Sequence, residues 1–123
     1  MCGTSLHWDG ASFSRSNSGT KEDLASIWGS RADDVWAGGA NGTLLHWNGT
    51  AWSPMPGVVS AQTLNGIWGS SDKDVWILNG ADEVLHWTGS FAAQKTGAGG
   101  AEFGIWGSSE KDVWVTAVGG KII

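Results

Sequence analysis

A ten-residue segment that occurs three times constrains this chain more than any other feature. The copies begin at Ile27, Ile67 and Ile105 and read IWGSRADDVW, IWGSSDKDVW and IWGSSEKDVW. Their starts lie 40 and 38 residues apart. Self-similarity at a period of roughly 40 residues is typical of repeat proteins, in which each unit is one supersecondary structure stacked on its neighbours. We therefore interpret the 123 residues as about three such units.

A second marker recurs in step with the first. The sequence Leu-His-Trp, followed by Asp, Asn or Thr and then by Gly, begins at Leu6, Leu45 and Leu85. The Asp-Gly and Asn-Gly pairs are strong signals for a two-residue hairpin turn, because both tolerate the left-handed backbone that such a turn needs. An aromatic residue follows each turn, namely Phe13, Trp52 or Phe91. Each unit therefore contains a strand, a turn and the start of another strand.

The repeated decapeptide itself predicts a hairpin. Residues 65–69 form a short apolar segment, a polar loop of four or five residues follows, and residues 74–78 form a second apolar segment. A five-residue loop places Trp68 opposite Trp76, as a cross-strand aromatic pair. A third strand of this unit ends at Trp87. A fourth strand follows the next turn, as it does near Trp52 in the preceding unit. Each repeat therefore holds four short antiparallel strands.

Four strands in a repeat of this length predict an all-β protein built of β-propeller blades, about three to the chain. The runner-up is a β-solenoid. We expect one propeller segment, with a half-blade and connection at 1–26, blades at 27–66 and 67–104, and a complementary half-blade at 105–123. Because three blades leave apolar faces open, we expect a homo-oligomer that closes the ring through a split blade, most simply a dimer of three-blade chains. The alternative is a segment cut from a longer propeller.

Charge and composition limit the classes of partner that the chain is expected to bind. The net charge is −5, and the seven Lys and Arg are scattered, so no basic stripe is present for nucleic acid or an anionic membrane surface. No apolar run has the length of a membrane span, which predicts no membrane insertion. The single Cys2 cannot form an internal disulfide.

The residues that could carry chemistry are themselves repeated. His7, His46 and His86 occur once per unit, which spreads them around a ring and argues against a shared metal. We expect them to hydrogen-bond the backbone of a neighbouring blade, with a ligand pocket as the alternative. The acid pairs of the hairpin loops are expected to be solvated turn residues rather than a calcium site; they are Asp33 with Asp34, Asp72 with Asp74, and Glu110 with Asp112.

No nucleophile elbow, CxxC, P-loop or dinucleotide fingerprint occurs in the sequence. Catalysis needs one asymmetric constellation, whereas a repeat offers the same residues several times. The sequence therefore predicts a protein that is not an enzyme and has no cofactor.

The two markers resemble a known family. Asp-Val-Trp followed by Ala, Ile or Val, and the Leu-His-Trp turn with its aromatic, are similar to the repeats of β-propeller lectins, tectonin-type propellers above all. The likeness covers nearly the whole chain, but it departs from the WD40 form because His and Trp are adjacent here. The resemblance implies a glycan-binding and surface-binding protein without enzymatic activity, with an extracellular or cell-surface location favoured.

The expected function is thus a multivalent carbohydrate-binding module with repeated sites at or between blades. An aromatic ring covers the C–H face of a sugar while polar turn residues take its hydroxyls, and several weak sites on one rigid ring gain avidity. The candidate residues are Trp52, Phe13, Phe91, Asp9, Asn48 and Thr88, with Asp33, Asp72 and Glu110 as second choices. The alternative is a structural or protein-interaction propeller, including an engineered or excised fragment that self-assembles into a ring.

Overall fold

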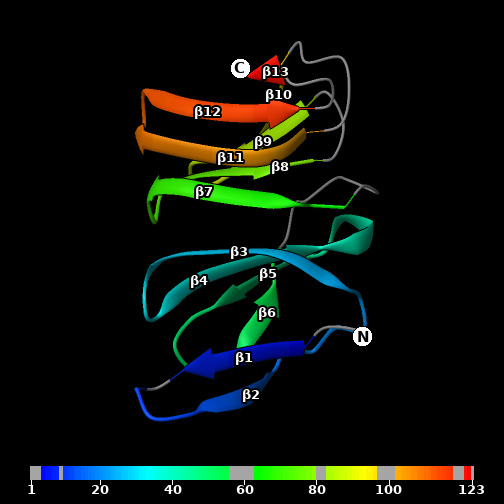
Figure 1. The fold of residues 1–123 in the computed structure, drawn as a ribbon, viewed down its shortest axis with the longest axis vertical. Helices are drawn as coiled ribbons and strands as arrows, with labels where there is room; N and C mark the ends of the chain where they lie inside the picture. The colour runs from blue at the N-terminus through cyan, green and yellow to red at the C-terminus, as the bar shows by residue number, and fades with distance from the viewer. Residues whose placement is uncertain are drawn as a thin grey trace.

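The computed structural model describes residues 4–8, 10–55, 63–79, 83–96, 102–117 and 121–122. Its thirteen strands form four antiparallel sheets, stacked face to face along the longest axis of the molecule (Figure 1). The prediction of an all-β chain built of propeller-type sheets is confirmed. No helix among the described residues is long and apolar enough to cross a membrane.

Two of the sheets have four strands each. The first contains β3 (Leu24–Arg31), β4 (Asp34–Gly39), β5 (Leu44–Trp47) and β6 (Trp52–Pro54), with a 3₁₀ turn, η1 (Ala40–Gly42), between β4 and β5. The second contains β7 (Gly66–Ser71), β8 (Asp74–Leu78), β9 (Glu83–Trp87) and β10 (Phe91–Lys95). In both sheets the strands pair in chain order, so each is a simple meander.

The other two sheets are smaller and lie at opposite ends of the stack (Figure 1). The N-terminal one has only β1 (Thr4–Trp8) and β2 (Phe13–Asn17). The C-terminal one has β11 (Glu102–Ser109), β12 (Asp112–Ala117) and the short β13 (Lys121–Ile122). The predicted blade boundaries at 27, 67 and 105, and closure of a ring by a second chain, stay predictions.

The decapeptide forms the hairpin that the sequence predicts. Trp68 lies opposite Trp76, and Trp28 opposite Trp36, in the antiparallel register. The strands reach further into the polar segment than expected, because a register shift between Gly69 and Ser71 admits one extra residue and leaves a turn of two residues. The turns of the three decapeptide hairpins, β3–β4, β7–β8 and β11–β12, lie at the same edge of the stack (Figure 1).

The core lies between sheets. Ile67, Ile77 and Leu85 share one face of the second sheet, because they are opposite one another in register, and they pack against Trp36 and Leu44 of the first sheet. Trp36 is only 1% exposed, and its ring meets the ring of Trp87 edge to face at 5.1 Å. Alternation along the strands thus gives each sheet with a decapeptide hairpin two faces: an aliphatic face, which carries the Ile of the hairpin, and a tryptophan face, which carries its two Trp.

Two contacts between a tryptophan and a glycine of successive decapeptides join neighbouring sheets. A Cβ atom on Gly69 would lie 2.7 Å from Cη2 of Trp28, and one on Gly107 would lie 2.6 Å from Cη2 of Trp68. The indole of one sheet therefore covers the glycine of the next, at a distance that excludes any side chain there.

Two of the six hairpin tryptophans are not buried between sheets. Trp106 and Trp114 are 61% and 50% exposed. They lie on the tryptophan face of the sheet at the C-terminal end of the stack, so no further sheet of this chain covers them in the described structure. The aliphatic face of the same sheet is covered, because Val115 packs with Leu78 and Val84 of the second sheet.

Candidate functional site

Each four-stranded sheet contains a partly buried cluster of Ser, Asp and His, in which the Asp is the buried member. In the first sheet Asp34 begins β4, His46 lies on β5, and Nε2 of His46 is 2.6 Å from Oδ1 of Asp34. Ser30 donates a hydrogen bond to the other oxygen of the same carboxylate. In the second sheet Asp74, His86 and Ser70 repeat the arrangement, with 2.5 Å between His86 Nε2 and Asp74 Oδ1.

These clusters correct two sequence-based expectations. The histidines bond a carboxylate of their own sheet rather than the backbone of a neighbouring one. Asp34 and Asp74 are buried, at 6% and 8% exposure, and are not solvated turn residues. Of the other acids of the first two turns, Asp33 is exposed and pairs with Arg31 at 2.7 Å. Arg31 also reaches the partly exposed Asp72 of the next turn at 3.3 Å.

The surroundings of Asp34 favour its ionised form. Burial disfavours the charge, but the hydrogen bonds from Ser30 and His46, together with the charge of His46, outweigh it and hold the pKa of Asp34 below its ordinary value of 3.8. The Trp36 indole also favours the carboxylate. Its N–H nevertheless lies outside hydrogen-bond geometry, so within the described chain Trp36 Nε1 has no partner.

The third decapeptide holds only part of this cluster. Ser108 donates to Asp112 as its counterparts do, but the carboxylate receives its other bond from Trp114 Nε1 at 3.1 Å. No imidazole reaches Asp112 in the described structure. The remaining histidine, His7, lies on β1 at the other end of the stack and is exposed.

The predicted sugar-binding residues lie in three different sheets. Trp52 is opposite Trp47, with ring centroids 5.7 Å apart, and Phe91 is opposite Trp87 at 6.4 Å. Phe13 is opposite Trp8 in the N-terminal sheet and is 67% exposed. Trp52 and Phe91 therefore lie beside the tryptophans before their own turns, and the structure does not bring the three candidate aromatics together.

The predicted turn residues behave differently from one another. Asn48 uses its side-chain oxygen within the turn, where it accepts hydrogen bonds from the backbone N–H groups of Thr50 and Ala51 at 2.9 and 3.0 Å. Thr88 is exposed. Asp9 lies outside the described residues, and Glu110 is exposed in the third hairpin turn.

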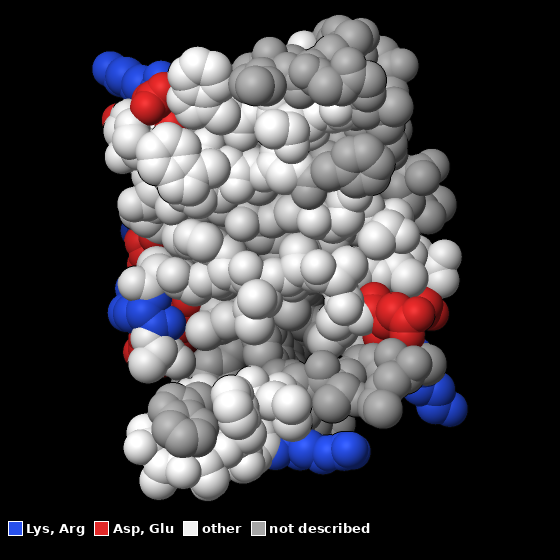
Figure 2. Space-filling model, in the orientation of Figure 1, with Lys and Arg blue, Asp and Glu red and all other residues white. Residues whose placement is uncertain are grey.

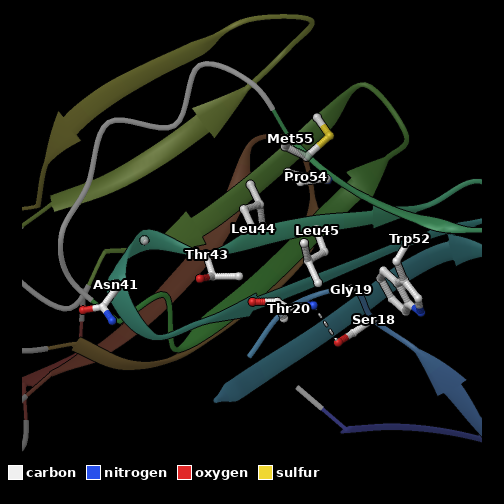
Figure 3. Close-up of a pocket in the computed structure, with 11 residues that line it drawn as sticks. Ser18, Gly19, Thr20, Asn41, Thr43, Leu44, Leu45, Trp52, Pro54 and Met55 are labelled. Atoms are coloured by element: carbon white, nitrogen blue, oxygen red, sulfur yellow. Dashed lines mark hydrogen bonds between the residues drawn. The ribbon is translucent and has the colours of Figure 1, made fainter. Parts of the chain in front are cut away.

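Trp52 borders a cavity of about 360 Å³ beside β5 and β6 (Figure 3). Figure 3 shows the Trp52 ring at one end of this cavity and Asn41 at the other, with Ser18 and Thr20 between them. Thr43, Pro54 and Met55 complete much of the wall, and none of the lining residues is charged. Hydroxyl and amide groups thus face a cavity that also has apolar walls. We refer to it as the Trp52 cavity.

Sequence reasoning identified only Trp52 in this cavity. Ser18 and Thr20 belong to the connection between β2 and β3, and Asn41 and Thr43 to the turn between β4 and β5. Small polar residues in loops carry no signal beyond turn formation. Asn41 does adopt a left-handed backbone, with φ of 56°, and its side chain donates to Glu22 at 2.8 Å.

A second recess, of about 490 Å³, separates the N-terminal two-stranded sheet from the first four-stranded sheet. Its walls are mostly apolar and include Leu6, Ile27, Val35 and Trp47. Ile27 is 66% exposed there, whereas its counterpart Ile67 is 7% exposed. His7 and Arg15 also line this recess. In Figure 2 the described Lys, Arg, Asp and Glu lie toward the edges of the viewed face, and the described residues between them are uncharged. We refer to this recess as the end groove.

Meandering four-stranded sheets that stack face to face define a β-propeller fold, and comparison with solved structures agrees. Eight chains of known structure match, among them one described as YCF48 bound to D1 peptide, with a TM-score of 0.70 and 18% sequence identity. The match covers 82% of this chain but 36% of the other, so the chain spans about a third of that neighbour's length. No family model matches the sequence. No curated protein matches it either.

Proposed function

We propose that this chain is a non-catalytic binding module whose Trp52 cavity takes a short uncharged segment of a protein partner. The lining of the cavity supports this proposal. It combines the hydroxyl or amide groups of Ser18, Thr20, Asn41 and Thr43 with the apolar surfaces of Trp52, Pro54 and Met55, and it carries no charge. Peptide bonds offer donors and acceptors to such hydroxyls, while apolar side chains cover the tryptophan.

The size of the cavity fits this ligand class. A volume of about 360 Å³ lies near the lower end of the ~300–1,000 Å³ of ligand pockets, which is enough for two or three residues of a peptide. The neighbour of like fold was solved with D1 peptide bound, and this shared architecture supports the choice of a peptide over other ligands.

The Ser, Asp and His clusters support a non-catalytic role. Ser30 and His46 both bond the carboxylate of Asp34. In a catalytic triad the serine instead bonds the histidine, which removes its proton. Here the imidazole nitrogen that would act as the base is held by the acid. The cluster is therefore organised to lock strands β4 and β5 together rather than to activate a nucleophile.

A carbohydrate is the second candidate, because the Trp52 cavity contains an aromatic ring beside several hydroxyls. A pyranose would stack one face on the indole and hydrogen-bond to Thr43 and Ser18. The tectonin-like repeat markers support the same ligand class. Against it, Phe13 and Phe91 lie in other sheets, so each further site would need its own polar partners.

An array of uncharged hexapeptides and a glycan array, each probed with the labelled chain, separate the two candidates. We expect saturable binding to a subset of peptides, weakened about tenfold or more by Trp52→Ala and by Thr43→Val. Ser90→Ala is the control, because Ser90 is an exposed turn residue of the second sheet, and it should bind like the parent. Sugar binding that Trp52→Ala abolishes would replace the peptide by a glycan. Binding to neither array would refute the proposal.

A further inference from the structure

We propose that a second copy of this chain completes the C-terminal sheet: β1 of the second copy pairs with β12 of the first, and His7 of the second copy bonds Asp112 of the first. This inference does not depend on what the Trp52 cavity binds. It follows from three features that are incomplete within one chain and complementary between two.

The first feature is the hydrogen-bond cluster of Ser, Asp and His. Where a third strand is present, His46 lies opposite Trp36 and bonds Asp34, and His86 lies opposite Trp76 and bonds Asp74. Asp112 has its serine but no histidine within the described chain, and Trp114 takes the vacant bond instead. His7 has no carboxylate partner among the described residues. One copy therefore offers the acid and the other offers the imidazole.

The second feature is a pair of open strand edges. β13 pairs with β12 only at Thr116 and Ala117. The complete sheets pair the third strand further along, as Val35 with Trp47, Trp36 with His46 and Ala37 with Leu45. The same register on β12 places three residues of the second copy's β1 opposite the remaining positions: Trp8 opposite Val113, His7 opposite Trp114, and Leu6 opposite Val115. Leu6 to Trp8 would thus continue the strand that β13 begins.

The third feature is the pair of apolar faces that end the stack. Within the chain, Trp28 and Trp36 of one sheet cover the aliphatic face of the next, and Trp28 lies over Gly69. The equivalent tryptophans at the C-terminal end, Trp106 and Trp114, are exposed, as is Ile27 in the end groove. If the two copies stack on each other as neighbouring sheets do within the chain, Trp106 lies over Gly29 of the second copy. Trp114 then lies in the end groove of that copy. The two exposed faces then bury each other.

A second copy meets these requirements better than the same chain folding back. β1 and β12 lie at opposite ends of the longest axis (Figure 1), so one chain does not bring them together in this fold. Two copies related by a twofold axis satisfy both ends at once, because the C-terminal end of each meets the N-terminal end of the other. The result is a closed stack of six sheets with two His7–Asp112 pairs.

Light scattering on the eluting peak of a sizing column tests the inference. At about 10 μM we expect twice the 12.9 kDa of one chain. Trp106→Ala, Asp112→Asn and His7→Ala should each weaken the association about tenfold or more, because each removes one side of the contact. Lys111→Ala is the matched control, since Lys111 is exposed in the turn beside Asp112, and it should leave the mass unchanged.

Circular dichroism of the same samples separates loss of association from loss of folding. We expect the three variants to keep the β-sheet spectrum of the parent, because Trp106 and His7 are already exposed in the single chain. A parent mass of 12.9 kDa would overturn the inference. So would folded variants that keep the doubled mass, because the contact would then lie elsewhere.

Discussion

At the scale of single residues, Asp34 links three segments of one sheet through its two carboxylate oxygens. It receives a hydrogen bond from Ser30 before the turn and lies 2.6 Å from His46 on the third strand. A buried carboxylate is costly unless such partners replace its water. Asp34 and Asp74 are therefore structural residues that fix the register of the hairpin on the third strand.

Acid should remove the contribution of Asp34 selectively. Because the pKa of folded Asp34 lies below the ordinary 3.8, the unfolded chain takes up the proton first as the pH falls, so this stabilisation is present above 3.8 and is lost below it. Asp34→Asn should lower the free energy of unfolding by about 1–3 kcal/mol at neutral pH, and by less at each step from about pH 5 to about pH 3. Urea unfolding followed by tryptophan fluorescence measures both.

The matched control is Asp33→Asn at the neighbouring position. Asp33 is 59% exposed and pairs with Arg31 at the surface, where an ion pair contributes little. This variant should stay within about 0.5 kcal/mol of the parent at every pH. A destabilisation by Asp34→Asn that is equal at both ends of the pH range would show that its carboxylate acts sterically rather than through its charge.

At the scale of elements, the Trp-Gly marker works between sheets rather than within a strand. Trp28 covers Gly69, and Trp68 covers Gly107. The glycine therefore sets how closely consecutive sheets approach. The tryptophan ring of one sheet occupies the space that the glycine of the next sheet leaves open.

Gly69→Ala should lower the free energy of unfolding by about 1–3 kcal/mol, because the added Cβ would lie 2.7 Å from Trp28 Cη2 and 2.6 Å from the backbone oxygen of Asp74. A double-mutant cycle with Trp28→Leu isolates the first of these contacts. The cost of Gly69→Ala should be smaller in that background, with a coupling of at least about 0.5 kcal/mol measured by urea unfolding. Strict additivity would mean that the strain arises within the hairpin alone.

At the scale of the whole molecule, the stack has two unlike ends. One exposes Trp106 and Trp114, and the other exposes Ile27 and Leu6. When the apolar end of one molecule packs against the opposite apolar end of another, both ends are removed from water, and this favours association.

Thermal stability should consequently depend on concentration. Because a second copy binds the folded chain and not the unfolded one, raising the chain from about 1 to about 100 μM should raise Tm by several degrees. The same series on His7→Ala should show a lower Tm at each concentration, with the largest gap at intermediate concentrations where only the parent is paired. A parent Tm that does not change over this range would contradict association through the ends.

The sequence by itself determined the secondary structure and the way strands join into sheets. Trp68 opposite Trp76, the turn at Asn48 and the strand that ends at His86 and Trp87 follow from alternation and turn chemistry, which depend on residues close together along the chain. The recurring decapeptide made the repeat period visible in the same way, whereas the number of blades stays a prediction.

Only the tertiary structure decided what those residues contact. Asp34 and His46 meet across twelve residues, Trp28 reaches Gly69 across forty-one, and Thr20 and Thr43 share a cavity with Trp52. The same residue at equivalent repeat positions also has different surroundings: Trp36 is buried while Trp114 is half exposed, because burial depends on whether another sheet lies against that face. Local alternation assigns a side chain to a face of its sheet, and the stacking of whole sheets determines what that face meets.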